Sequence, residues 1–390
     1  MGFHMKKQMS MEYDSPKMKV VRGLKSLLQK KRIENGERLP TEFKIAEIYG
    51  VSRGTVRTAL AELERDGFIK SVRNTCRIST FEDKIIETSF LAKTCIMLSK
   101  LSNDPAVYAE SGLMWAVEAG VINACRAYGL NTMFFNEKNI KDGSYRKVFE
   151  MNPFGVLVSH SISDDANYSD GFKFAEAQGL PVVVNGGGDS LSYFDRVIAD
   201  QEKGCYLLAR HLADSGAKRI LRLWTAPEST YWLKDRNRGF EKAIREKKLA
   251  LLPPVHVKGL EDRVKGSREV FDKRTRQYAG YLAEYLTGRN RVDAIIVTAD
   301  SDYYPVAAAC RLFKIDPLED VLVAGYDNFY DECEEFAWEK SVPFVTIDKR
   351  NFETGRRMFE LLNSRKYRSG SGKAQLVKIE PELVKTRGCI

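Results

Sequence analysis

The sequence predicts an α/β protein in which a small N-terminal domain of helices and one hairpin precedes a larger, two-lobed domain with doubly wound parallel sheets. Three observations lead to this fold class. Up to about residue 80, apolar residues recur at helical spacing. From residue 94 onward, short β-branched runs alternate with helical segments, as in parallel βαβ units. About 300 residues of such units exceed one ordinary sheet domain, which favours two lobes.

The expected boundaries are a tail over residues 1–15, the small domain over 16–79, a linker over 80–93 and the two-lobed domain over 94–390. The small domain starts with a helix, because Pro16 suits the first helical turn. The apolar stripe of this helix, which runs to about Arg32, consists of Val20, Val21, Leu24, Leu27 and Leu28.

A helix, a turn and a second helix follow. Thr41 is expected to cap the first of these helices, Gly50 to end it, and Ser52 to cap the second. A short hairpin is expected over residues 71–78. The apolar residues that should face the core are Ile45, Ile48 and Tyr49 in the first helix, then Val56, Leu60, Leu63 and Ile69.

The opposite face of the second helix is polar in its first turns, where Arg53, Thr55, Arg57 and Thr58 stand. A recognition helix enters the major groove of DNA by its N-terminal end. There an Arg can bind guanine through two hydrogen bonds, and a Thr methyl can touch thymine. The pattern favours DNA binding; the alternative is a helical hairpin whose charged face is merely solvated.

The distribution of charge agrees with a nucleic-acid-binding domain. Residues 1–80 contain 17 Lys and Arg against 9 Asp and Glu, whereas the rest of the chain contains 45 against 44. The formal net charge of +9 therefore belongs almost entirely to the small domain. Such a basic module attached to a neutral one is the electrostatic pattern of a DNA-binding protein.

Residues 37–69 also resemble the winged helix-turn-helix of the GntR family. LPTE at residues 39–42 stands for the family's LP[ST]E, and VSRGTVR at 51–57 for VSRxTVR; ALAEL at 59–63 and Asp66-Gly67 complete the signature. The resemblance implies that Arg53, Thr55 and Arg57 contact the operator. The full set of residues expected to bind DNA or support its binding is Thr41, Glu42, Ser52, Arg53, Thr55, Arg57, Thr58, Arg73 and Arg77.

Two positions depart from the family pattern. Phe43 stands where many members have a DNA-contacting Arg. The wing lacks the usual Gly-x-Gly tip and offers Arg73, Asn74 and Arg77 instead. Any approach of the wing to the minor groove would then depend on these arginines.

In the larger domain, each element follows from a β-branched run or a helical stripe. The expected strands are residues 94–99, 131–136, 155–160, 181–185, 196–200, 219–224, 255–257, 294–300, 321–327, 344–348 and a single closing strand at 376–384. The expected helices are 109–128, one closing at 148–151, 172–178, 203–215, 236–248, 277–287, 304–313 and 352–363.

Ligands of doubly wound sheets bind beyond the carboxyl ends of the strands. The candidate segments are therefore residues 99–103, 159–163, 186–189, 299–303 and 326–328. An Arg and carboxylates that converge there suit a polyhydroxylated ligand, because charged groups form strong hydrogen bonds. Arg236, Asp300 and Asp327 are the candidates, and Trp232, Tyr231 and Trp115 offer rings for stacking. Alternatively, Arg236 pairs with Asp235, and Asp327 caps a turn.

Residues from about 94 to 390 resemble the effector domain of LacI-type repressors, which is similar to periplasmic sugar-binding proteins. The similarity rests on LARHL at residues 208–212 with SGAKRI at 215–220, on RNRGF at 236–240, on DVLVAGYD at 320–327 and on PELVKTRG at 381–388. It implies that Arg236 and Asp327 bind the effector. Ala299 stands where the family often has Asn, so one usual polar contact is absent.

A GntR-type DNA-binding domain joined to this effector domain resembles regulators of the arabinose-repressor type. The resemblance implies a homodimer on palindromic double-stranded DNA, with operator affinity controlled by a small molecule, most often a sugar. Other ligands, such as a nucleobase, nucleoside or peptide, stay open as alternatives, as does a sensor that binds no small molecule.

Other classes of protein find little support. The seven cysteines are scattered without a Cys-x-x-Cys pair and histidines number four, so the sequence predicts no metal, no cofactor and no disulfide framework. Gly186–Gly188 invites a phosphate-loop interpretation, but no Gly-Lys-[Ser/Thr] follows. An enzymatic C-terminal domain is therefore the weaker alternative. Because no signal peptide or apolar span is evident, a cytoplasmic protein is expected.

Overall fold

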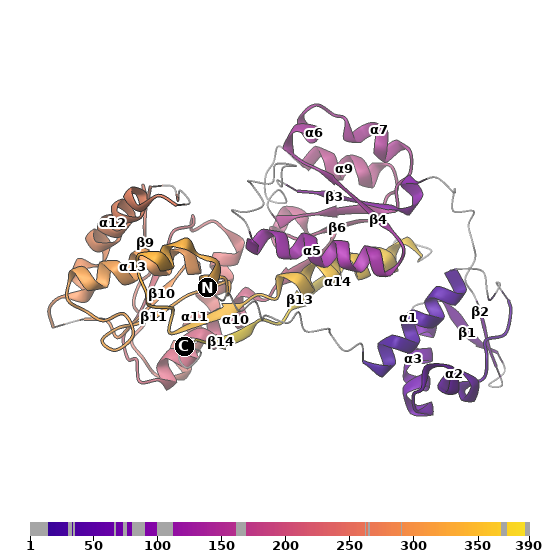
Figure 1. The fold of residues 1–390 in the computed structure, drawn as a ribbon, viewed down its shortest axis with the longest axis horizontal. Coiled ribbons are helices and arrows are strands. Elements are labelled where there is room, and N and C mark those ends of the chain that lie inside the picture. The colour runs from indigo at the N-terminus through magenta and orange to yellow at the C-terminus, as the bar shows by residue number, and fades with distance from the viewer. Residues whose placement is uncertain are drawn as a thin grey trace, which may run out of the picture. The chain divides into compact units, whose positions relative to one another are not determined.

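The computed structural model describes residues 15–29, 33, 36–65, 68–72, 76–79, 90–99, 112–160, 169–261, 263, 266–289, 291–367 and 373–386. The chain divides into two compact units, which are described separately (Figure 1). The first contains residues 1–92 together with 364–370, and the second contains 93–363 together with 371–390. The assignment of 364–370 to the first unit has no counterpart in the sequence pattern.

The first unit contains α1 (Pro16–Gln29), α2 (Glu42–Tyr49), α3 (Arg53–Arg65) and an antiparallel hairpin of β1 (Ile69–Val72) and β2 (Cys76–Ser79). This is the predicted order of helices and wing. The turn between α2 and α3 depends on Gly50, which has a φ of 64° and donates its N–H to the Ala46 carbonyl.

The core of this unit joins one face of each helix to the base of the hairpin. Val20, Val21, Leu24 and Leu28 of α1 pack with Ile45, Val56, Leu60 and Leu63. One prediction about this core is wrong: Ile48 is 56% exposed, because it lies on the outer side of the short helix α2. Ile69 is buried in the core as predicted, although it belongs to β1, because α3 ends at Arg65.

The first lobe of the second unit has a six-stranded parallel sheet in the order β13-β7-β6-β5-β3-β4. Its helices cover both faces, with α6, α7 and α9 above the sheet and α5 and α14 below it in Figure 1. The strands are β3 (Thr94–Leu98), β4 (Asn131–Phe135), β5 (Gly155–Val158), β6 (Val182–Val184), β7 (Asp195–Ala199) and β13 (Leu376–Ile379); the helices are α5 (Gly112–Ala127), α6 (Glu137–Lys141), α7 (Tyr145–Glu150), α9 (Ser169–Ala177) and α14 (Asn351–Lys366).

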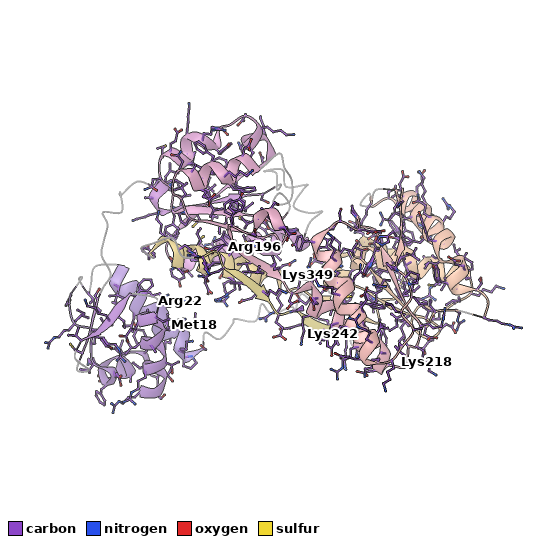
Figure 2. All side chains as sticks on the ribbon, turned by 180° about the vertical axis from the view of Figure 1, so that it is seen from behind. Met18, Arg22, Arg196, Lys218, Lys242 and Lys349 are labelled. Atoms are coloured by element: carbon purple, nitrogen blue, oxygen red, sulfur yellow. The ribbon has the colours of Figure 1, made fainter. Side chains whose placement is uncertain are left out.

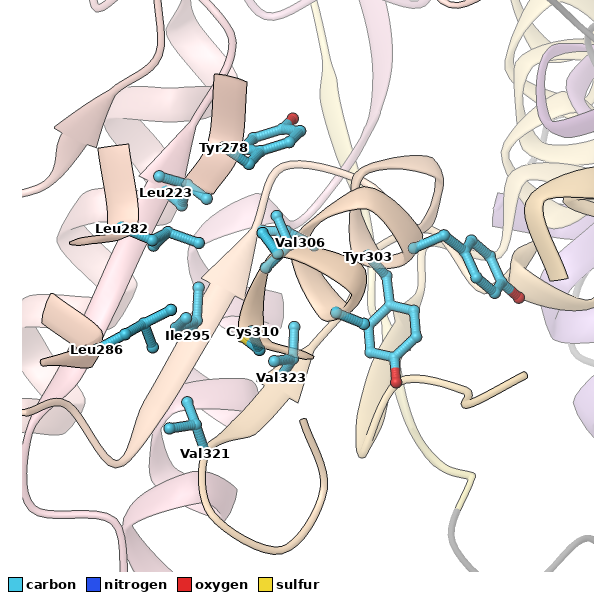
Figure 3. Packing of buried hydrophobic residues seen from close by; sticks show 14 of the residues in the cluster. Leu223, Tyr278, Leu282, Leu286, Ile295, Tyr303, Val306, Cys310, Val321 and Val323 are labelled. Atoms are coloured by element: carbon cyan, nitrogen blue, oxygen red, sulfur yellow. The ribbon is translucent and has the colours of Figure 1, made fainter. Parts of the chain in front are cut away.

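The second lobe has a four-stranded parallel sheet in the order β11-β10-β8-β9 and a two-stranded antiparallel sheet of β12 and β14. Figure 3 shows one side of its core, in which Tyr278 and Leu282 pack near the sheet residue Leu223. The strands are β8 (Ile220–Trp224), β9 (Val255–His256), β10 (Ala294–Val297), β11 (Leu322–Ala324), β12 (Val345–Asp348) and β14 (Glu382–Lys385); the helices are α10 (Gln201–Asp214), α11 (Tyr231–Glu246), α12 (Arg268–Leu286) and α13 (Asp300–Leu312).

The mixed α/β fold class is therefore confirmed, but the single closing strand is wrong. Residues 376–379 form β13 beside β7 in the first lobe, and residues 382–385 form β14 beside β12 in the second. Pro381 lies between them and has no N–H for a ladder, so the strand breaks there and its two halves join different sheets. The predicted strand 294–300 also ends early, because α13 starts at Asp300.

Close helix contacts fix the geometry of the second lobe. A Cβ on Gly239 would lie 1.9 Å from the Glu202 carbonyl oxygen, so α11 reaches the backbone of α10 only with glycine at this position. The motif that begins at Arg236 thus combines a polar side chain with a tight helix contact and, at Phe240, a core residue.

Candidate DNA-binding and effector-binding sites

The exposed face of α3 carries the side chains expected to read DNA. Ser52, Arg53, Arg57 and Thr58 are exposed, whereas Thr55 is half-buried. The Ser52 hydroxyl accepts the Thr55 N–H at 3.1 Å and thereby caps the helix, so Ser52 has a structural role within the fold. Thr58 donates to the Gly54 carbonyl at 3.1 Å. The guanidinium groups of Arg53 and Arg57 extend from the first turns of the helix, where its N-terminal dipole also favours phosphate.

Glu42 holds three arginines together at one end of this surface. Arg57 Nε donates to Glu42 Oε2 at 2.8 Å, and Arg77 Nη1 donates to Oε1 at 3.1 Å. Arg53 Nη2 lies 4.0 Å from Oε2. The hydrogen bond from Arg57 is the main reason why the pKa of Glu42 is lowered. A carboxylate that stays charged thus fixes the directions of the arginine side chains on this surface.

The remaining predicted residues differ in what they contact. Thr41 caps α2 by accepting the Lys44 N–H at 3.3 Å, which supports the fold. Arg77 lies in β2, within 3.9 Å of Glu64 as well as beside Glu42. Arg73 lies outside the described residues. Phe43, which replaces a family Arg, is 69% exposed, so this surface position offers an apolar ring instead of a charge.

The candidate effector site lies where strand order reverses in both parallel sheets of the second unit. In the second lobe this point separates β8 from β10, and in the first lobe it separates β3 from β5. The loops that leave such neighbours turn in opposite directions and open a crevice for ligands. Thr225 and Thr298 follow β8 and β10, and the Thr225 N–H donates to Thr298 Oγ1 at 2.8 Å.

Arg236 lies at this reversal point with 3% of its side chain exposed. Its Nε donates to Gln201 Oε1 at 2.9 Å, and its Nη1 donates to the Thr298 carbonyl at 2.7 Å. The guanidinium carbon lies 3.4 Å from the centroid of the Tyr326 ring and 4.6 Å from that of Trp232. These contacts fix the plane of the guanidinium and leave Nη2 directed toward Asp327, 3.8 Å from Oδ1.

Asp327 projects from the loop after β11 with a φ of 96°, a conformation that Asp and Asn adopt more readily than other side chains. Its N–H donates to the Ile347 carbonyl at 2.8 Å, which holds the loop in place. Lys349 Nζ lies 2.8 Å from Asp327 Oδ1 in an ion pair, yet this oxygen lacks a well-directed hydrogen bond within the described chain. Asp327 thus keeps an acceptor site beside two cations. The side chain of Lys349 can be located in Figure 2, where it is labelled.

Asp300 is completely buried and faces the protein interior. Its Oδ1 accepts the Thr346 hydroxyl at 2.8 Å, and its Oδ2 accepts the Phe329 N–H at 2.8 Å. A Cβ on Gly325 would lie 1.9 Å from Asp300 Oδ1, so the glycine makes room for the carboxyl. These bonds tie the start of α13 to the loop that carries Asp327. Among the four predicted effector residues, Asp300 is the one whose oxygens are both occupied within the fold.

We expect Asp300 to make stability depend on pH. Burial, with the Asp327 carboxylate acting in the same direction, raises the pKa of Asp300 to about 8. The unfolded chain has a pKa near 4, so between about pH 4 and pH 8 the folded state binds more protons and its stability falls as pH rises. In Asp300→Asn, the amide can donate to Thr346 while its oxygen accepts from Phe329. The unfolding temperature of Asp300→Asn minus that of the wild type should therefore be several degrees larger at pH 8 than at pH 5.

The three aromatic candidates differ in their contacts and in their exposure to solvent. Trp232 is half-buried and lies against Arg236. Tyr231 packs so closely on the turn after β6 that a Cβ on Gly187 would lie 2.2 Å from its ring. Trp115 is 38% exposed on α5. Trp232 therefore has a direct contact with the Arg236 guanidinium, at 4.6 Å from its ring centroid.

First-lobe residues approach the same corner. His160, which follows β5 and is accessible to solvent, lies close enough to Lys349 and Asp327 to interact with both charges. Partial desolvation of the imidazole and the nearby Lys349 ammonium lower the pKa of His160, against the opposing effect of Asp327. The imidazole is therefore neutral near pH 7 and offers one donor and one acceptor.

Four residues of this corner were not predicted individually from the sequence: Gln201, Lys349, His160 and Thr298. Each follows a strand: Gln201 comes two residues after β7, Lys349 directly after β12, His160 two residues after β5, and Thr298 directly after β10. Applying the strand-end rule to every predicted strand would have included Gln201 and Lys349. Among the described residues, no group of three His, Cys, Asp or Glu side chains is arranged to hold a metal ion. The described helices include none that is long and apolar enough to cross a membrane.

Comparison with protein families matches two segments of the chain. Residues 16–75 match the model of bacterial regulatory proteins of the gntR family, and residues 209–388 match the periplasmic binding protein-like domain. The predicted combination of a GntR-type helix-turn-helix with a periplasmic-binding-protein-like domain is confirmed.

Several known transcriptional regulators are similar to most of this chain. The arabinose metabolism transcriptional repressor of Halalkalibacterium halodurans is 24% identical over 362 residues, 89% of each chain. The transcriptional repressor PurR of Aliivibrio fischeri is 26% identical over 268 residues, 68% of this chain and 74% of the relative. Among solved structures, the regulator CelR in complex with cellobiose aligns with a TM-score of 0.57 at 17% identity, over 90% of this chain and all of that one. The probable maltose operon repressor malR of Staphylococcus aureus has a TM-score of 0.56 at 18% identity, over 75% and 95%.

Proposed function

We propose that this chain, which joins a gntR-type DNA-binding domain to a periplasmic-binding-protein-like domain, is a transcriptional repressor whose affinity for operator DNA is controlled by a small molecule. The effector is most simply a sugar, bound between the two lobes by Arg236 and Asp327. The protein acts on DNA in the cytoplasm as a homodimer, and its operator is a palindrome whose half-sites match the two-fold symmetry.

The observation that carries the effector site is the pairing of Arg236 with Asp327 at the reversal point of the second-lobe sheet. Asp327 Oδ1 retains an unused acceptor site at 8% exposure, and Arg236 Nη2 points at the same place. A ligand hydroxyl set between them accepts from the guanidinium and donates to the carboxylate, and both hydrogen bonds are charge-assisted. Trp232 provides an apolar surface for the ring of the sugar.

Control of DNA binding follows from differential affinity. His160 of the first lobe and Lys349 of the second lie near Asp327, so a ligand held here contacts both lobes and favours the arrangement in which they approach each other. A ligand shifts an equilibrium only by the difference in its affinity for the two states. Release of DNA on ligand binding requires that the closed arrangement hold the two DNA-binding domains in a spacing unsuited to the operator.

A nucleobase or nucleoside is the second candidate. Relatives named PurR match 68% of this chain, and Trp232 with Arg236 can stack on a planar base as well as on a sugar. Sugars remain the first candidate because an ion-paired carboxylate and an Arg at this corner match the alternating hydroxyls of a polyol.

A panel of ligands tests the proposal. We expect one compound among pentoses, hexoses, sugar acids, disaccharides and nucleosides to raise the thermal unfolding temperature of the full-length protein. A ligand at 100 times its dissociation constant adds about 2.7 kcal/mol, or several degrees for a domain of this size. The same compound should change the midpoint of operator binding in a gel-shift titration. If the compound stabilises the protein but leaves DNA binding unaltered, the proposed control is wrong.

A further inference from the structure

The carboxyl group of Glu118 lies buried at the point where strand order reverses in the first-lobe sheet. β3 and β5 are neighbours there, while β4 lies on the outer side of β3. Ser99 and Ser159 are the first residues after β3 and β5. The Ser99 hydroxyl donates to Glu118 Oε1 at 2.9 Å, and Ser159 also hydrogen-bonds the carboxyl. The carboxyl is thus fixed at the edge where doubly wound sheets bind ligands.

Glu118 is incompletely satisfied within the fold. The residue is 0% exposed, and its Oε2 has no hydrogen-bond partner among the described residues. Burial raises the pKa of Glu118, against the effect of hydrogen bonds from Ser99 and Ser159. A buried acceptor without a donor loses its hydrogen bonds to water and gains none in return, which destabilises the folded state. Apolar residues fill most of the lobe, so a carboxyl in this place destabilises the fold unless another molecule completes its hydrogen bonds.

The surroundings connect this carboxyl to the corner formed by Asp327. His160 follows Ser159 directly in the chain and lies near both Lys349 and Asp327. The loops that leave β3 and β5 thus hold Ser99, Ser159 and His160, the two serines bind the Glu118 carboxyl of α5, and His160 connects this group to the corner formed by Asp327. These groups can donate and accept hydrogen bonds but carry no positive charge. They therefore suit the hydroxyls of a neutral polyol better than an anionic ligand.

We infer that Glu118 is the first-lobe contact of the effector, and that its Oε2 accepts a hydrogen bond from an effector hydroxyl. The inference rests on the proposed function and deepens it, because it assigns a specific acceptor on the lobe opposite to Arg236 and Asp327. Closing the lobes on a ligand would satisfy this oxygen, so part of the binding energy of the effector arises from completing a bond that the empty protein lacks.

A test without any ligand uses thermal unfolding of full-length Glu118→Gln at pH 7.5. Glutamine keeps the shape and an oxygen for Ser99 but removes an acid that is costly to ionise when buried, so we expect the unfolding temperature to rise by about 2–4 °C. The matched control is Asp302→Asn. Asp302 is also buried, but both of its oxygens are bonded: Oδ1 accepts from Arg274 at 2.8 Å and from Tyr278 at 2.7 Å, and Oδ2 accepts from the Thr225 hydroxyl at 3.3 Å. Its variant should therefore unfold at a lower temperature. A decrease for Glu118→Gln similar to that of the control would show a structural carboxyl and overturn the inference.

A second test uses the compound that stabilises the wild-type protein most in the panel of sugars and nucleosides. Glu118→Gln should weaken its affinity at least about tenfold while the affinity of the ligand-free variant for DNA is unchanged. Unaltered affinity of Glu118→Gln, combined with lost affinity of Asp327→Ala, would overturn this inference alone. Unaltered affinity in both variants would overturn the location of the site and hence the proposed function. If no panel compound acts on the wild type, the ligand-free comparison decides.

Discussion

Replacing Asp327 with alanine is expected to abolish the response to the effector, with a loss of effector affinity of about 30-fold or more. Truncating one member of a buried, hydrogen-bonded charge pair costs about 2–5 kcal/mol, largely because the partner remains unpaired. Here Lys349 loses an anion at 2.8 Å and Arg236 one at 3.8 Å. Affinity of the ligand-free protein for operator DNA should stay within about twofold, since the recognition helix is untouched.

The backbone of Asp327 requires a control for this experiment. At a φ of 96°, alanine is strained where Asp and Asn are tolerated, so Asp327→Ala loses stability as well as a charge. Asp327→Asn keeps the backbone preference and one oxygen but removes the charge. Both variants should lose the effector response, whereas only alanine should lower the unfolding temperature markedly. If either variant still releases DNA at the wild-type effector concentration, Asp327 does not bind the effector.

The order of helices and strands could be predicted because it depends on local patterns. Buried parallel strands such as Gly155–Val158 are short apolar runs, and helices such as Gln201–Asp214 carry an apolar stripe beside a capping Asp200. The exact ends were less predictable, because tertiary contacts decide them. α12 begins at Arg268, nine residues before the predicted start, with Ser267 as its cap. The same cap could have been found from sequence, since Ser267 precedes Glu269 and an apolar residue.

The split of the closing strand depends on a relation between two lobes that no local pattern describes. Residues 376–384 have the pattern of one strand, and Pro381 marks an interruption without indicating that the two halves join separate sheets. Likewise, Asp300 and Asp327 both follow strands and looked equivalent. The fold distinguishes them, because Thr346 and the Phe329 N–H lie opposite Asp300 in the folded chain but 46 and 29 residues away in sequence.

The arginine cluster of the first unit illustrates the same limit. The motif identifies Arg53 and Arg57 on α3, and the atypical wing offers Arg77 on β2, as separate candidates. The structure brings all three to Glu42, which from the sequence is one more residue expected to bind DNA or support its binding. An acidic residue at the start of α2 thus sets where three cations point. Its effect depends on the approach of the hairpin to the helices, which spacing along the chain does not encode.

Replacing Arg57 with alanine is expected to weaken operator binding by about 1–3 kcal/mol, roughly 5- to 150-fold. Its exposed guanidinium projects from the second turn of α3 and is oriented by the 2.8 Å hydrogen bond to Glu42. A residue that binds a base loses discrimination between operator and unrelated DNA, whereas one that binds phosphate loses affinity for both equally and lowers the salt dependence by about one ion. Gel-shift titrations of operator and scrambled DNA at several salt concentrations separate these outcomes.

Glu42→Gln provides the matched variant for this last experiment, because it leaves Arg57 in place but removes the charge that orients it. Loss of one negative charge beside DNA should raise the affinity for scrambled DNA. The affinity for the operator should rise less, because Arg57 is no longer oriented by Glu42. The ratio of operator affinity to scrambled-DNA affinity should therefore fall. Lys44→Ala controls for simple loss of surface charge, because the exposed Lys44 ammonium group pairs only with Glu47 among its described contacts.

An unchanged operator midpoint for Arg57→Ala would remove Arg57 from the recognition surface and leave Arg53 and Thr55 as the residues of α3 that read the operator.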